Sequence, residues 1–89
     1  MNSKTTSNFQ DMLETLPLQI QQSAREAYKF FNLNPNHPSL QFKKVHNTRP
    51  IYSVRINVDY RALGEIDGND IIWFWIGPHR EYEKLLRRI

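Results

Sequence analysis

Residues Ile71 to Ile76, with the sequence IIWFWI, place the strongest constraint on how this chain can fold. Every position of the stretch is apolar, so neither face of a strand built from it suits contact with water. The stretch therefore predicts a central strand that is buried on both sides. Asp67-Gly68-Asn69 before it is a hairpin-turn signal, and Gly77-Pro78 ends it.

Two helices are predicted ahead of the strands. The first has an apolar stripe with helical spacing and Ser7 as its candidate N-cap, and Pro17 ends it. Pro17 also suits the start of the second helix. The first stripe consists of Phe9, Met12, Leu13 and Leu16, and the second of Ile20, Ala24, Ala27, Tyr28 and Phe31.

Four strands and a closing helix complete the prediction. The strands span Leu40–Val45, Ile51–Val58, Tyr60–Ile66 and Ile71–Ile76, and an apolar stripe at Tyr82, Leu85, Leu86 and Ile89 predicts the last helix. The expected fold class is α+β, with two N-terminal helices packed on a four-stranded, mainly antiparallel sheet and a short C-terminal helix. Residues 1–8 are expected to form a flexible N-terminus, and residues 9–89 a single domain.

Positive charge is concentrated in the middle of the chain. The net charge is +3, and residues 37–61 hold five Lys and Arg residues against one acid. Within this segment Val54, Ile56 and Val58 alternate with polar residues, which predicts one apolar and one polar sheet face. An arginine on such a strand is held in a defined direction, so the segment predicts a fixed cationic surface for an anionic partner.

Composition excludes several classes of site. The chain has no cysteine, so it has neither disulfides nor a thiolate metal site. His37 and His46 have no partners at metal-ligand spacing, and no metal or other cofactor is expected. There is no apolar run long enough to span a membrane and no signal-peptide pattern at the start, so we expect a cytoplasmic protein without a membrane partner.

The order of these elements and three local motifs resemble the RelE/ParE superfamily, the toxins of type II toxin–antitoxin pairs. The motifs are Tyr52-Ser53-Val54-Arg55-Ile56, then Tyr60-Arg61, and finally Ile76 to Tyr82, in which a glycine is followed by a histidine and an aromatic residue. The match is closest to a RelE-like subgroup that carries HPSL-x-FKKV and WFWIG-x-H. Two departures stand out, since members usually begin with a strand and many carry glycine where this chain has Pro50 and Ile51.

The resemblance implies a ribosome-dependent endoribonuclease that cleaves mRNA without a metal ion and is neutralised by a cognate antitoxin. By position, Arg61 would contact the scissile phosphate, and Arg55 falls on a basic position of the preceding strand. His79 would act as a general acid or stabilise the transition state, and Tyr82 approximates a catalytic tyrosine. Arginine suits phosphate because its planar fork is permanently charged, and histidine exchanges protons near neutral pH. The expected RNA-binding residues are Lys43, Lys44, His46, Arg49 and Arg80.

Ordinary structural interpretations of the same residues remain open. Arg55 and Arg61 are also what a solvated strand carries, and His79 is also an ordinary residue for a helix start. Tyr82 can simply pack in the core, and Trp73 and Trp75 fit the core better than an RNA-binding platform. The alternatives at the level of function are a ParE-like inhibitor of DNA gyrase and an inactive RelE-like domain that only binds RNA or protein.

Overall fold

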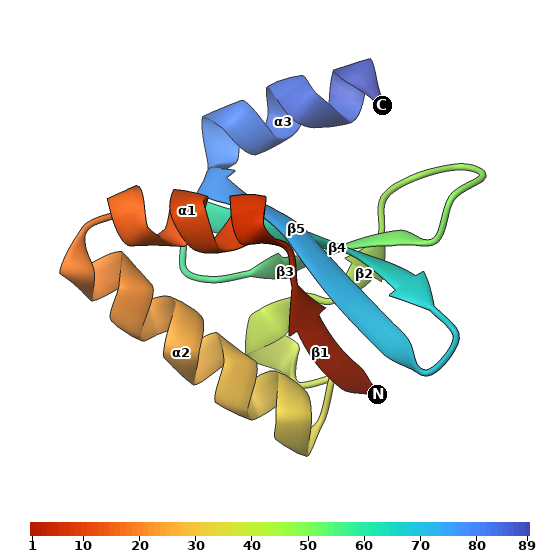
Figure 1. The fold of residues 1–89 in the computed structure, drawn as a ribbon, viewed down its shortest axis with the longest axis horizontal. Coiled ribbons are helices and arrows are strands. Elements are labelled where there is room, and N and C mark those ends of the chain that lie inside the picture. The colour runs from red at the N-terminus through yellow and green to blue at the C-terminus, as the bar shows by residue number, and fades with distance from the viewer.

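The protein forms a five-stranded sheet with helices on both faces (Figure 1) in a computed structural model that describes all of residues 1–89. The elements are β1 (Asn2–Thr5), α1 (Ser7–Thr15), α2 (Leu18–Leu33), the short 3-10 helix η1 (Pro38–Leu40), β2 (Lys43–Lys44), β3 (Ile51–Arg55), β4 (Tyr60–Asp67), β5 (Asp70–Pro78) and α3 (His79–Arg88). The strand order is β1-β5-β4-β3-β2. Only β1 and β5 run parallel; the other neighbours are antiparallel. The α+β class is thus confirmed, but the predicted number of four strands is wrong.

The additional strand lies where a flexible N-terminus was expected. Asn2 to Thr5 pair with Asp70 to Trp73 of β5, and Lys4 forms an ion pair of 3.0 Å with Asp70. These four residues are mostly polar and exposed, so no alternation of apolar side chains marks them as a strand. Their extended conformation is stabilised by pairing with a segment about 70 residues away, which a local pattern does not reveal.

The two N-terminal helices follow the predicted stripes, with one correction at the start of α1. The N-cap is Thr6, whose hydroxyl accepts a hydrogen bond of 3.0 Å from the backbone N–H of Phe9, and Ser7 is the first helical residue. Leu16 precedes Pro17 and has extended backbone angles, so α1 ends there. Pro17 then stands at the N-cap of α2.

The strands before the hairpin are shorter than predicted. Only Lys43–Lys44 of the expected Leu40–Val45 strand pairs, because η1 occupies the beginning and Gln41 has a left-handed φ of 47°. The strand expected to reach Val58 ends at Arg55, because the Asn57 side chain accepts hydrogen bonds from the backbone N–H groups of Asp59 and Tyr60 and so forms a turn. The last two strands extend one to two residues beyond their predicted ends.

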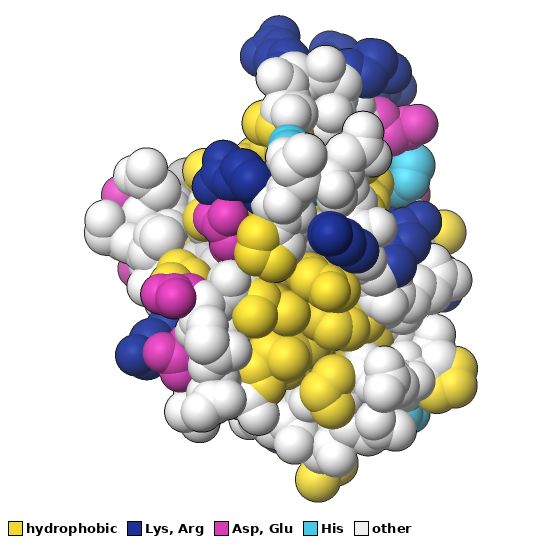
Figure 2. Space-filling view, turned by 90° about the vertical axis from the view of Figure 1, so that its right-hand side faces the viewer, with side chains coloured by type: hydrophobic (Ala, Val, Ile, Leu, Met, Phe, Trp, Pro, Cys, Tyr) yellow, Lys and Arg dark blue, Asp and Glu magenta, His cyan; other side chains and the backbone are white.

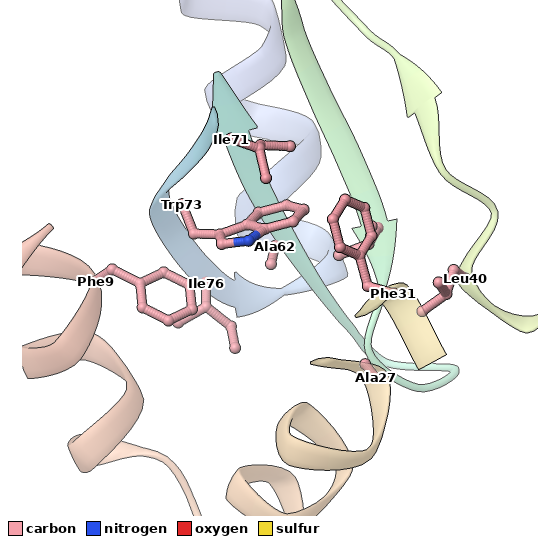
Figure 3. Packing of buried hydrophobic residues seen from close by; sticks show 9 residues of the cluster. Phe9, Ala27, Phe31, Leu40, Ala62, Ile71, Trp73 and Ile76 are labelled. Atoms are coloured by element: carbon pink, nitrogen blue, oxygen red, sulfur yellow. The ribbon is translucent and has the colours of Figure 1, made fainter. Parts of the chain in front are cut away.

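One layer of the core lies between the sheet and the helices α1 and α2. In Figure 3 the Trp73 indole lies near Phe31, and the two rings meet edge to face with centroids 5.3 Å apart. The buried members of this cluster are Phe9, Ala27, Phe31, Leu40, Val54, Ala62, Ile71, Trp73 and Ile76. From the sheet it contains Val54 of β3, Ala62 of β4 and three residues of β5.

A second, smaller layer of the core lies beneath α3, on the sheet face that was predicted to be exposed to solvent. Ile51, Leu63 and Tyr82 form a separate buried cluster there. Ser53, expected to face water, is only 2% exposed, whereas Val58, expected on the apolar face, is 66% exposed in the turn after β3. The prediction that β5 is buried on both sides holds for one face only: Ile71, Trp73 and Ile76 are buried under α1 and α2, whereas the other apolar residues of the strand are only half-buried because α3 covers that face in part. None of the helices combines the length and apolar character that crossing a membrane requires.

Candidate active site at the start of helix α3

The strand register brings the two candidate arginines together. Arg55 of β3 is the pairing partner of Arg61 of β4, and Arg61 is also paired with Gly77 of β5. Directly paired residues project to the same face, and Arg55 lies two residues from Ser53, which is covered by α3. The two guanidinium groups therefore rise from the sheet face on which α3 lies.

Helix α3 begins beside this arginine pair. Its first residue is His79, whose backbone N–H donates a hydrogen bond of 2.7 Å to the carbonyl of Asp59 in the turn between β3 and β4. The imidazole lies against the Tyr82 ring with centroids 5.5 Å apart, and its Nδ1 is 3.2 Å from a carboxylate oxygen of Glu83. The His79 side chain is 42% exposed, so a substrate can reach it.

Arg61 is partly withdrawn from solvent. Its Nη1 donates hydrogen bonds to the carbonyls of Asn57 (2.8 Å) and Tyr60 (3.0 Å). Burial lowers the pKa of Arg61 and the positive charge of Arg55 lowers it further, whereas Tyr82 and Asp59 raise it. The guanidinium stays charged at neutral pH, because arginine titrates far above it. The two arginines, paired across β3 and β4, thus repel each other at this end of the sheet.

Tyr82 occupies an interior position. Its side chain belongs to the buried cluster with Ile51 and Leu63, and the hydroxyl donates a hydrogen bond of 3.1 Å to the Ser53 hydroxyl. The ring packs beside His79 while the hydroxyl points into the protein. Tyr82 thus anchors α3 to β3 beside three residues that strand pairing and the start of α3 bring near one another, Arg55, Arg61 and His79, which we call the Arg–His cluster.

Comparison with known proteins identifies the family. A family model described as a ParE-like toxin domain matches residues 18–84, most of the chain. This protein belongs to the ParE-like toxin domain family. The assignment confirms the resemblance to the RelE/ParE superfamily. No curated protein sequence matches the chain.

Solved structures of toxins share the fold of this ParE-like domain. The RelB–RelE antitoxin–toxin complex from Methanococcus jannaschii matches with a TM-score of 0.74 and 19% identity, over 92% of this chain and 96% of that one. YafQ from E. coli matches with a TM-score of 0.73 and 6% identity, over 91% and 96%. A YoeB/ParE toxin from Agrobacterium tumefaciens matches with a TM-score of 0.71 and 13% identity, over 89% and 99%. At these identities the likeness establishes the fold.

The predicted RNA-binding residues of the ParE-like domain do not form one surface. Lys43 pairs with Ser53 and Lys44 with Tyr52, so the two lysines project to opposite faces of the sheet, and only Lys43 shares the face of α3. Arg80 is exposed in the first turn of α3. It begins a series of exposed basic residues along the helix, and Figure 2 shows Lys and Arg gathered at the top of the molecule, over α3. The series consists of Arg80, Lys84, Arg87 and Arg88.

Arg49 and His46 are engaged in contacts within the protein. Two nitrogens of Arg49 donate hydrogen bonds of 2.9 and 2.6 Å to the Glu65 carboxylate, which raises the pKa of Arg49 and lowers that of Glu65. His46 Nδ1 accepts the backbone N–H groups of Thr48 and Arg49, and Nε2 lies 2.8 Å from the carbonyl of Ile89. The imidazole and the guanidinium thus hold the loop before β3 against β4 and the end of α3.

Two neighbours of the Arg–His cluster were not singled out from the sequence. Glu83 follows His79 by four residues, and this spacing on a predicted helix is a signal that could have revealed the pair. Ser53 carries no comparable signal, because its burial depends on the position of α3. No group of three or more His, Asp or Glu side chains is arranged to hold a metal ion.

Proposed function

We propose that this protein is the toxin of a type II toxin–antitoxin pair and acts as a metal-independent endoribonuclease on mRNA bound to the ribosome. Family membership supports the toxin assignment. The nuclease assignment rests on one observation: the pairing of Arg55 with Arg61 beside the first residue of α3, His79. A fixed pair of cations next to a group that exchanges protons is what phosphodiester cleavage requires.

The reaction assigned to this cluster is an attack of the ribose 2′-oxygen on the adjacent phosphorus. A base takes the 2′-hydroxyl proton, the phosphorus becomes pentavalent with additional negative charge, and the bond to the 5′-oxygen breaks as that oxygen gains a proton. Arg55 and Arg61 stabilise the negative charge on the phosphoryl oxygens. His79 supplies the proton to the leaving oxygen. Tyr82 serves as a positioning residue, because its hydroxyl is committed to Ser53.

The test is cleavage of a defined mRNA on purified ribosomes, with the new ends mapped by primer extension. We expect Arg61→Ala and His79→Ala to lower the cleavage rate by ~100-fold or more, in the range for loss of one charge-stabilising or proton-transferring group. Arg49→Ala is the matched control and should keep most of the cleavage activity. It also removes one arginine charge, but Arg49 is bound to Glu65, which lies four residues after Arg61 in β4. Full activity in both site variants, or no cleavage by the folded wild-type protein, contradicts the nuclease proposal.

We also propose a cognate antitoxin as the physiological partner, in the cytoplasm. Two of the similar structures, from Methanococcus jannaschii and Pyrococcus horikoshii, are complexes of RelE with RelB. Co-expression of a small open reading frame adjacent to this gene should suppress growth inhibition by the protein. Growth inhibition that no adjacent gene suppresses argues against a paired antitoxin.

A second candidate function is inhibition of DNA gyrase, which requires a binding surface but no catalytic groups. The observation that favours it is that both Arg61 and Tyr82 already use polar atoms in hydrogen bonds within the protein. A supercoiling assay separates the two proposals. Inhibited supercoiling with intact mRNA supports the gyrase inhibitor, and binding of RNA with neither effect supports an inactive RNA-binding domain.

A further inference from the structure

The two tryptophans of the chain lie on opposite faces of β5. Gly64 of β4 pairs with Trp73 and Leu63 pairs with Trp75, so Phe74 is the additional residue of a β-bulge. Trp73 is 7% exposed in the core beneath α1 and α2. Trp75 is partly exposed and packs against the cluster beneath α3, the face that carries the Arg–His cluster. The expectation that both indoles belong to the core therefore holds fully only for Trp73.

The Trp75 indole lies over Gly77. A Cβ atom added to Gly77 would be 2.8 Å from Cζ2 and 2.9 Å from Cη2 of the indole, so only glycine allows this position. Gly77 is the pairing partner of Arg61 and lies two residues before His79. The six-membered ring of Trp75 is thereby placed over the strand position next to Arg61, at the end of the sheet where α3 begins.

The edge of this indole that carries the nitrogen reaches the surface. Nε1 of Trp73 donates a hydrogen bond to the Ser3 hydroxyl, but Nε1 of Trp75 has no partner within the protein. The structure contains no buried side-chain nitrogen or oxygen without a hydrogen-bond partner, so Nε1 of Trp75 is accessible to solvent. The adjoining Cε2 atom is 3.5 Å from the Cβ position at Gly77. The accessible edge therefore lies near Gly77, the strand partner of Arg61.

We propose that Trp75 is a binding residue on which an unpaired base of the RNA stacks, next to the phosphate held by Arg55 and Arg61. This inference rests on the proposed function and adds a subsite to it. Single-stranded RNA is commonly held by charge on the backbone combined with stacking on aromatic rings. The arginines supply the first contact and Trp75 supplies the second. Gly77 keeps the ring in place by leaving room for it above the strand.

Tryptophan fluorescence tests the proposal, because the chain has two tryptophans and each can be observed alone. The variant Trp73→Phe reports on Trp75, and the variant Trp75→Phe reports on Trp73. The probe is a short single-stranded RNA with 2′-O-methyl groups, which cannot undergo attack by the 2′-oxygen. A matched probe with abasic sites keeps the phosphates and lacks the bases.

We expect the probe to quench the Trp75 emission at least twofold and to leave the Trp73 emission nearly unchanged. The abasic probe should bind without quenching. Trp75→Leu should weaken binding of the complete probe by roughly tenfold, as expected for loss of one stacked base, and should leave binding of the abasic probe unchanged. Should Trp73→Phe fail to fold, wild-type protein containing 5-fluorotryptophan gives two fluorine NMR signals, and the Trp75 signal should shift on addition of the probe.

Several results would overturn the inference: no binding of the probe, equal quenching of both tryptophans, quenching by the abasic probe, or unchanged affinity in Trp75→Leu. Ribosome-dependent cleavage by wild-type protein separates this failure from failure of the nuclease proposal. If cleavage is unaffected in Trp75→Leu, the stacking proposal is contradicted and the nuclease proposal stands. If quenching depends on the bases but no cleavage occurs, the stacking proposal stands and the nuclease proposal is contradicted.

Discussion

The hydroxyl groups of Tyr82 and Ser53 form a hydrogen bond of 3.1 Å in the interior, and this bond joins α3 to β3. Both side chains are at most 5% exposed, so neither hydroxyl can turn to water if its partner is removed. A single substitution therefore leaves a buried polar group without a partner, whereas removal of both hydroxyls does not.

We expect Tyr82→Phe and Ser53→Ala each to lower the free energy of unfolding by about 1–2 kcal/mol. The double variant should lose clearly less than the sum of the two, because it contains no orphaned hydroxyl. Denaturant unfolding of the four proteins measures this. Strictly additive losses would show that the two hydroxyls do not interact.

Gly64 is required for packing rather than for backbone conformation. A Cβ atom there would be 2.7 Å from Cε3 of Trp73 and 2.9 Å from Cγ1 of Ile71, both of which are buried. Gly64→Ala should therefore destabilise the protein by ~1–3 kcal/mol through overpacking. Gly68→Asn is the control, since Gly68 has a φ of 61° that asparagine tolerates and open space around it. Equal stability of Gly64→Ala and wild type in thermal unfolding contradicts the packing argument.

Sequence reasoning succeeded where the evidence is local. The run Ile71–Ile76 is apolar at every position, and α2 carries a long stripe of helical spacing, so both elements were predicted with the correct type. Pairing of Arg55 with Arg61 likewise follows once the two strands and the turn between them are recognised. The RelE/ParE resemblance also rested on residues close together in the chain.

The predictions that failed depend on contacts between distant segments. The alternation in β3 predicts that Ser53 faces solvent, but α3 covers it and buries it. Arg49 stays a predicted RNA contact, but its pairing with Glu65, sixteen residues away, is likewise not evident from the sequence. The polar strand β1 exists because β5 pairs with it. Patterns within a short window carry no information on such partners.

The start of α1 allows the sequence-based and structure-based interpretations to be compared directly. Thr6 accepts the Phe9 N–H, whereas Ser7 was the N-cap expected from the sequence. Thr6→Ala should cost about 1 kcal/mol of stability and Ser7→Ala only a few tenths, as for loss of a cap and for a change at an exposed helical residue. Thermal unfolding of the two variants distinguishes the positions. A larger loss of stability in Ser7→Ala than in Thr6→Ala would show that Ser7 is the N-cap.

Glu83 determines which nitrogen of His79 a substrate meets. A carboxylate only accepts hydrogen bonds, so His79 Nδ1, which is 3.2 Å from Glu83, carries a hydrogen in both protonation states, and Nε2 is the nitrogen that gains and gives up the proton delivered to the leaving oxygen. In Glu83→Ala the neutral imidazole should lose this preference, whereas Glu83→Gln retains an oxygen acceptor and should keep most of it. Nitrogen-15 chemical shifts of His79 measure the two forms. Identical shifts in wild type and Glu83→Ala would rule out this control of the tautomer.

The ion pair between Arg49 and Glu65 predicts a pH dependence of stability. Its hydrogen bonds lower the pKa of the Glu65 carboxyl below the value of an unpaired glutamate, about 4.3. A lowered pKa in the folded state stabilises the protein above the pKa of the unfolded chain, and this contribution disappears as the pH falls through the folded value. Wild type should therefore exceed Glu65→Gln in free energy of unfolding at pH 7, and the difference should shrink steadily between about pH 5 and pH 3.

Denaturant unfolding of both proteins at several pH values measures this difference. Lys4 lowers the pKa of Asp70 in the same direction, but that pair is present in both proteins and cancels in the comparison. Arg49→Gln is the second control: it removes the other partner and should reproduce the pH profile of Glu65→Gln. A difference between wild type and Glu65→Gln that stays constant from pH 7 to pH 3 cannot arise from ionisation of Glu65, and it would mean that the side chain stabilises the loop before β3 through uncharged contacts alone.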